Sequence, residues 1–110
     1  REVIDVEASA VLKMRDALDE SFVRAVELIR SCSGSLVVSG VGKAGHVARK
    51  LSATFASTGT PSHFLSPADA VHGDVGAVRS GDVVLLISAS GESDEIVSAV
   101  KRMGYGVERK

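Results

Sequence analysis

Lys43, His72 and Glu95 are the residues of this chain best suited to proton-transfer chemistry. Lys43 lies inside a glycine-rich turn, His72 stands next to a glycine in a predicted loop, and Glu95 lies one turn into a predicted helix. A carboxylate or an imidazole can move a proton, and a cation can stabilise an oxyanion. We therefore predict a catalytic site in which Glu95 exchanges the proton, Lys43 contacts a substrate oxygen or phosphate, and His72 takes part in catalysis or binds the substrate. The simpler alternatives are a solvated lysine, a glutamate that complements a helix dipole, and a structural histidine.

A serine-rich segment offers a second kind of chemistry. Ser88, Ser90 and Ser93 follow the apolar run 83–87 and precede a predicted helix. Hydroxyl groups combined with the free amides of a helix N-terminus are a common way to bind phosphate. Ser90 or Ser93 alone would be enough to cap the helix. Three serines exceed that need, so we predict that this segment binds a phosphate group.

The residues Gly40, Gly42 and Gly45 form a Gly-x-Gly-x-x-Gly pattern directly after the short apolar run 36–38. Such a pattern between a strand and a helix is typical of dinucleotide-binding turns. The acidic residue expected at the end of the next strand is not clear, because Asp69 comes slightly late. The pattern is therefore equally compatible with a ligand-binding turn and with a turn that packs a helix closely on a strand.

These segments belong to a predicted α/β fold with a parallel, doubly wound sheet in three αβα layers. Asp19 is a suitable N-cap for the second helix, which we expect to bury Phe22, Val26 and Ile29 and to stop near Gly34. The expected elements are helices at 2–18, 19–34, 44–57 and 94–103, and strands at 36–38, 63–65 and 83–87. The third strand has no polar alternation, which favours a central position. If the first and third strands are neighbours, both loops face one crevice at the carboxyl edge of the sheet.

The bulk properties exclude several functions. The chain has 110 residues, 45% hydrophobic and 25% charged, with a formal net charge of −1. These values fit one globular domain and argue against a nucleic-acid or membrane partner. The single cysteine, Cys32, allows no internal disulfide. We expect the protein to lie in the cytoplasm. We also expect it to form a homo-oligomer, either a dimer or a tetramer. We expect no cofactor and no metal, and read His46 and His63 as structural residues.

The motifs together resemble the sugar isomerase (SIS) domain, and within it the D-arabinose 5-phosphate isomerases of 3-deoxy-D-manno-octulosonate (lipopolysaccharide) biosynthesis. The resemblance rests on residues 38–46, 53–62, 70–74 and 88–96, with further matches at 4–8 and 18–23. It covers nearly the whole chain to about Gly104. It implies a SIS-type, flavodoxin-like fold in which residues 1–110 form the N-terminal portion of a single SIS domain.

The resemblance also implies an activity, the interconversion of D-arabinose 5-phosphate and D-ribulose 5-phosphate. Lys43 and Glu95 match catalytic positions of the family, whereas Gly59, Thr60 and His72 match positions that contact the substrate. The serine segment matches the loop that binds the sugar phosphate in these domains.

Three features depart from the family. Ser66 stands just before Pro67, where the family often has a histidine linked to inhibitory zinc. A further catalytic histidine and the paired CBS domains of full-length members are not in this sequence. The ending Tyr105–Lys110 does not look like a finished sheet edge, and we expect a domain that is truncated after the third strand–helix unit. These residues alone would then be inactive.

Two alternative functions remain open at this stage. A regulatory SIS domain would bind a sugar phosphate through the same serine segment without catalysis. It has no need for Lys43, His72 and Glu95 together, and their joint presence favours the enzyme. A dinucleotide-binding fragment rests on the glycine pattern alone, and the absence of a clear ribose-binding acid counts against it.

Overall fold

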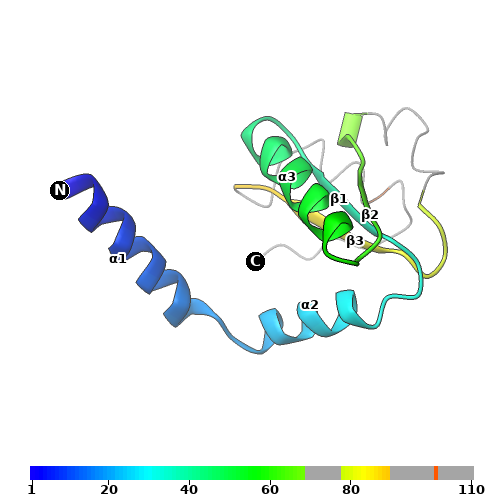
Figure 1. Ribbon diagram of the computed structural model, residues 1–110, viewed down its shortest axis with the longest axis horizontal. Coiled ribbons are helices and arrows are strands. Elements are labelled where there is room, and N and C mark those ends of the chain that lie inside the picture. The colour runs from blue at the N-terminus through cyan, green and yellow to red at the C-terminus, as the bar shows by residue number, and fades with distance from the viewer. Residues whose placement is uncertain (69–77, 90–100, 102–110) are drawn as a thin grey trace. The chain divides into compact units, whose positions relative to one another are not determined.

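The computed structural model describes residues 1–68, 78–89 and 101, in two separate units, 1–31 and 32–110 (Figure 1). The first unit consists of two helices, α1 (Glu2–Ala17) and α2 (Glu20–Arg30). The second contains a parallel sheet and the helix α3 (Lys43–Ser57). In the described part of the chain, no helix has both the length and the apolar character needed to cross a bilayer.

The predicted start of α2 is confirmed, whereas its predicted burial and end are wrong. Asp19 is the N-cap, and its carboxylate accepts a hydrogen bond from the Ser21 amide at 2.9 Å. The helix has no buried residue; Phe22 and Val26 are exposed and Ile29 is half-buried. The helix is amphipathic, as its spacing of apolar residues predicted, but no element within the unit 1–31 covers its apolar face.

The end of α2 comes before Gly34. The last helical residue is Arg30, and the C-cap is Ser31, whose hydroxyl donates to the Glu27 carbonyl at 2.7 Å. Gly34 is required for another reason, because a Cβ there would lie 2.2 Å from a carboxylate oxygen of Asp82.

Three parallel strands form the described sheet, in the order β2–β1–β3. They are β1 (Leu36–Gly40), β2 (Ser62–Phe64) and β3 (Val83–Ile87), close to the predicted positions. The adjacency of the first and third strands, on which the predicted crevice depends, is confirmed by five register pairs from Leu36↔Val83 to Gly40↔Ile87.

Among the described residues β1 is the central strand and β3 is an outer one, so the described sheet does not show the predicted central position of the third strand. Every residue of β1 is buried, whereas every residue of β3 is half-buried. A parallel strand reads as a continuous apolar run whether it is central or outer. The run 83–87 therefore could not reveal its place in the sheet. The buried hydrophobic residues of the described chain are Leu36, Val37, Val38, Ala48 and Leu65. Val78 and Val84 pack against the cluster that Val37 and Leu65 form.

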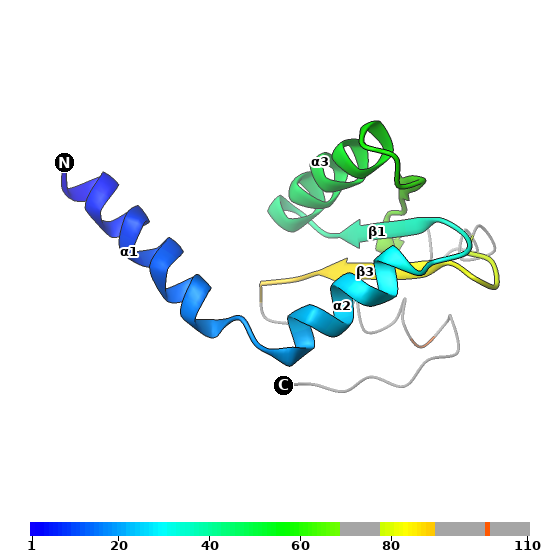
Figure 2. The same ribbon diagram turned by 60° about the horizontal axis from the view of Figure 1, so that its bottom comes forward.

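Helix α3 packs on one face of this sheet (Figures 1 and 2). Two glycines allow the close approach. A Cβ on Gly45 would lie 2.7 Å from the Gly40 carbonyl oxygen, and one on Gly40 would lie 2.9 Å from the Ala44 backbone. The close packing of the helix on the strand therefore explains why glycine occupies positions 40 and 45 of the Gly-x-Gly-x-x-Gly pattern.

Asp82 fastens the amino ends of β1 and β3 together. Its carboxylate accepts hydrogen bonds from the Ser35 amide and the Arg79 amide, each at 2.8 Å. The hydrogen bonds from these two backbone amides lower the pKa of Asp82 below its ordinary value, and the bond from Ser35 has the larger effect. The predicted turn at 80–82 is confirmed by Gly81, which has φ +92°. The hydrogen bond between Asp82 and Ser35 connects the amino ends of β1 and β3. It supports the register that places the carboxyl ends of the two strands side by side.

Candidate functional site

The carboxyl edge of the sheet brings two of the predicted loops next to each other. Gly40, the last residue of β1, is the register partner of Ile87, the last residue of β3. The residues that follow, Val41 and Ser88, therefore leave neighbouring strands at the same edge. In a parallel sheet this edge is where ligands bind.

The turn between β1 and α3 is open where the middle glycine of the pattern lies. Gly42 has φ +62°, a conformation that side-chain-bearing residues rarely adopt, and, its two chain neighbours aside, none of the described residues lies within 4 Å of the position of a Cβ. Gly42 is the N-cap of α3, and neither a side-chain cap nor an acidic residue of the first turn compensates the dipole there. The turn therefore presents a positive helix end that none of the described residues covers.

Lys43 is the first residue of α3 and is exposed. This position agrees with the prediction that its side chain is accessible at the mouth of the turn. Within the described part of the chain, no carboxylate forms an ion pair with it. A role for Lys43 at a reacting oxygen remains a prediction.

Four of the other predicted site residues lie outside the described residues. They are His72, Ser90, Ser93 and Glu95. Ser88 is described, lies directly after β3 and is half-buried. Of the predicted catalytic and serine-segment residues, the structure thus brings Lys43 and Ser88 to the same edge, and the convergence of Lys43 with His72 and Glu95 stays a prediction.

Gly59 and Thr60 lie at the opposite edge of the sheet. Helix α3 has 15 residues and runs back along the sheet for about 22 Å. The Thr60 amide donates to the Phe55 carbonyl at 2.9 Å, and the next residue, Pro61, accepts from Leu36 at the start of β1. Within one chain these two predicted substrate contacts are therefore separated from Lys43 and Ser88 by the length of the strands.

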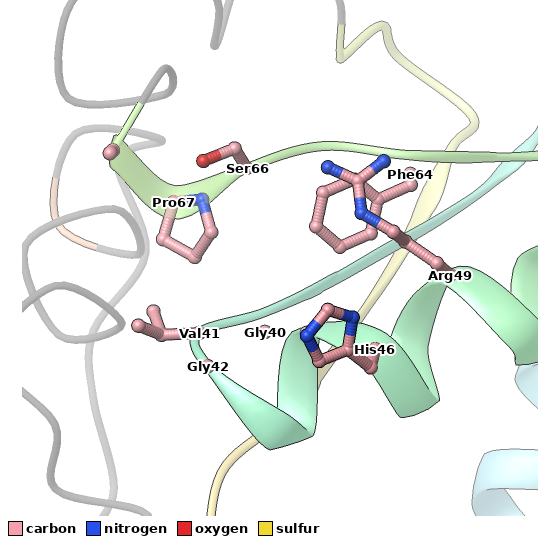
Figure 3. Close-up of a pocket in the computed structure, with 10 residues that line it drawn as sticks. Gly40, Val41, Gly42, His46, Arg49, Phe64, Ser66 and Pro67 are labelled. Carbon is pink, nitrogen blue, oxygen red and sulfur yellow. The ribbon is translucent and has the colours of Figure 1, made fainter.

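A pocket of about 340 Å³ opens beside the glycine turn, on the β2 side of β1 (Figure 3). One wall is the turn and the first two turns of α3, and the other is the end of β2 with the residues after it. The lining residues are Gly40, Val41, Gly42, Gly45, His46, Arg49, Phe64, Ser66, Pro67 and Ala68. Lys43 does not belong to this lining.

Arg49 was not among the predicted site residues, and His46 was predicted to be structural. Both are exposed on α3 and line the pocket, and the Arg49 guanidinium lies 4.0 Å from the centroid of the Phe64 ring. The spacing of 46 and 49 places them on one helix face, which was visible in the sequence. The contact between Arg49 and Phe64 depends on the packing of α3 on β2, so it was not visible in the sequence. His63 is also exposed, on β2.

Comparison with protein families decides the kind of domain. The model of the SIS domain matches residues 28–104, well over half of the chain. The chain belongs to the SIS domain family. The α/β fold with its parallel sheet agrees with this assignment, and the glycine turn and the start of the serine segment both lie within the matched residues of this SIS domain.

Named relatives of this SIS domain are isomerases. Arabinose 5-phosphate isomerase KpsF of Escherichia coli is 48% identical over 101 residues, 91% of this chain and 31% of the relative. Arabinose 5-phosphate isomerase GutQ of E. coli K12 is 44% identical over 103 residues, 94% of this chain and 32% of the relative. The chain therefore spans about a third of the length of these relatives.

A solved structure agrees with the fold of this SIS domain. The E. coli CFT073 protein c3406, in complex with arabinose 5-phosphate, superimposes with a TM-score of 0.83 and 48% sequence identity. The match covers 92% of this chain and 55% of the solved chain. In the described part of this SIS domain, no three His, Cys, Asp or Glu residues cluster as a metal site would require.

Proposed function

We propose that this chain is part of an aldose–ketose isomerase that interconverts D-arabinose 5-phosphate and D-ribulose 5-phosphate, for lipopolysaccharide biosynthesis. The observation that carries the proposal is the 44–48% identity, over more than nine-tenths of the chain, to relatives named arabinose 5-phosphate isomerases. The structural neighbour in complex with arabinose 5-phosphate supports a sugar-phosphate ligand at this fold.

The reaction moves one proton between adjacent carbons. A base takes the proton from C2 of arabinose 5-phosphate, leaving an enediolate, and an acid returns a proton to C1 while the hydroxyl proton of C2 moves to the C1 oxygen. In the proposal Glu95 exchanges the carbon-bound proton and Lys43 stabilises the enediolate oxygen. The exposure of Lys43 at the mouth of the β1–α3 turn supports this role, because an ammonium group there reaches the carboxyl edge without disturbing the core.

The substrate phosphate is proposed to bind at the serine segment, with Ser88, Ser90 and Ser93 as donors. The half-buried position of Ser88 at the end of β3, next to the open turn at Gly42, supports this choice. His72 is proposed to bind the sugar end. No cofactor enters the reaction, because a proton transfer of this kind needs only an acid, a base and an oxyanion stabiliser.

The proposal includes a homo-oligomer, because Gly59 and Thr60 lie at the amino edge of the sheet. If they bind the same sugar phosphate as Lys43 and Ser88, they must come from a second copy of the chain. It also includes a single SIS domain, of which residues 1–110 form the N-terminal portion, and a cytoplasmic location, in keeping with the lone Cys32.

The test is an assay of the intact protein that contains this chain. Arabinose 5-phosphate is supplied, ribulose 5-phosphate is measured, and ribose 5-phosphate serves as the control substrate, since it differs only in configuration at C2. We expect turnover of arabinose 5-phosphate and much less of ribose 5-phosphate. Tight binding of arabinose 5-phosphate without turnover would instead identify a regulatory SIS domain.

A further inference from the structure

In the pocket beside the glycine turn, the cationic side chain of Arg49 packs against the aromatic ring of Phe64. The Arg49 guanidinium lies over the face of the Phe64 ring, 4.0 Å from its centroid (Figure 3). Such a contact is attractive, because the negative face of the aromatic ring faces the cation. It reduces the freedom of a long side chain and leaves the N–H groups at the edge of the guanidinium plane available to a ligand.

The other polar groups of the pocket favour the same kind of ligand. His46 lies one turn before Arg49 on the same helix, and Ser66 lies beside Pro67 across the pocket (Figure 3). An imidazole N–H and a hydroxyl are both hydrogen-bond donors. Among the described residues, no Asp or Glu lines the pocket and none forms an ion pair with Arg49. The described lining therefore favours an anion.

The pocket is distinct from the place proposed for the substrate phosphate. It lies between α3 and the end of β2, whereas Ser88 follows β3 on the other side of the central strand. Neither Lys43 nor Ser88 lines it. Its volume of about 340 Å³ suits a small molecule.

We propose that this pocket is a second anion-binding site, in which Arg49, His46 and Ser66 hold the phosphate or carboxylate group of a small ligand other than the substrate. Arg49 makes the principal contact, since a guanidinium matches both groups with paired hydrogen bonds. Phe64 positions Arg49 and does not touch the anion. This proposal goes beyond the isomerase activity and does not require it.

The experiment follows the Nε–H signal of Arg49 by NMR in the intact protein, assigned with Arg49→Lys. Inorganic phosphate and malonate are titrated separately, each with and without saturating arabinose 5-phosphate. We expect at least one of the two anions to shift the signal in both conditions. A response to phosphate alone identifies a phosphate site, one to malonate alone a carboxylate site, and a response to both a general anion site.

Variants connect the response to the pocket. Arg49→Gln should weaken anion binding, measured by calorimetry in the presence of arabinose 5-phosphate, by about 10- to 100-fold, as expected for hydrogen bonds to a charged group. Phe64→Leu should weaken it less, by removing the support of the guanidinium. Lys50→Gln is the matched control, because Lys50 is an exposed cation next to Arg49 that does not line the pocket; it should leave binding unchanged.

Two results would overturn the proposal. One is an Arg49 signal that responds to neither anion in either condition. The other is a response that arabinose 5-phosphate abolishes, since the pocket would then belong to the sugar site. A protein that fails to bind arabinose 5-phosphate contradicts the proposed function instead, and the titration without sugar still decides the question of the pocket.

Discussion

Gly40 and Ile87 are register partners at the carboxyl ends of two neighbouring parallel strands. Parallel strands lie about 4.8 Å apart, so the glycine turn that begins at Val41 and the serine segment that begins at Ser88 start side by side. Asp82 fixes this register from the other end of the same two strands. One backbone pairing thus connects the two segments that the sequence marked as functional.

Replacement of Lys43 tests whether it serves the reaction. Lys43→Ala in the intact protein should lower kcat by about 10²-fold or more, the scale of losing one group that stabilises an oxyanion. The melting temperature should hardly change, because the side chain is exposed. Lys50→Ala, on the same helix, should change neither quantity. A large drop in melting temperature, with activity lost in proportion, would mean that Lys43 has a structural role.

Replacement of the serines tests the phosphate site. Ser88→Ala combined with Ser90→Ala should weaken binding of arabinose 5-phosphate by about 1–3 kcal/mol, because hydrogen bonds to a charged phosphate are lost. Isothermal titration calorimetry measures the effect. Ser57→Ala is a control, since the Ser57 hydroxyl donates only to the carbonyl of Thr54 within the last turn of α3. Unchanged affinity in the double variant would exclude the serine segment.

The carboxylate of Asp82 should make stability depend on pH. Its pKa is lowered in the folded protein by the amides of Ser35 and Arg79, so its stabilising effect is complete above the unfolded pKa of about 4. That effect is lost as the pH falls below this value through the folded pKa. Asp82→Asn should lower stability at pH 7, because an amide group would face one of the two N–H donors.

The measurement for Asp82 is urea denaturation of wild type and variant at pH 7 and pH 3. We expect the difference between the two proteins to be smaller at pH 3, because below the unfolded pKa the unfolded wild-type chain takes up a proton at Asp82 more readily than the folded protein does. An equal difference at both pH values would show that the charge of Asp82 does not contribute. Asp16→Asn is the control, because Asp16 is exposed and pairs with its neighbour Arg15.

The sequence predicted those parts of the fold that depend on local pattern. The strand at Leu36–Gly40, the helix that follows it and the N-cap at Asp19 all come from spacing and capping residues near one another in the chain. It did not predict that β1 is the central described strand, because apolar runs look alike in central and outer parallel strands.

The candidate site also has features that the sequence predicted and features that it did not. The glycine pattern predicted a turn from a strand into a helix with Lys43 accessible in it, but it left open whether that turn binds a ligand or only packs the helix on the strand. The stacking of Arg49 on Phe64 was not predicted, because it joins residues on different elements and depends on the depth to which α3 settles on the sheet. The separation of Gly59 from Lys43 follows from the expected order of a strand, a helix and a second parallel strand, because the helix returns the chain to the amino edge of the sheet. The motif match alone does not say which edge a residue occupies.

The central claim is that this domain moves a carbon-bound proton of a sugar phosphate. The most direct measurement is NMR of arabinose 5-phosphate in deuterated water with the intact protein, following exchange of the C2 proton. The account predicts exchange in the wild type, and in Glu95→Gln it predicts unchanged substrate binding with exchange slowed by about 10²-fold or more, the usual scale of general acid–base catalysis. Wild-type exchange in Glu95→Gln would remove Glu95 from the mechanism, and a wild-type protein that binds the sugar phosphate without any exchange would contradict the account as a whole.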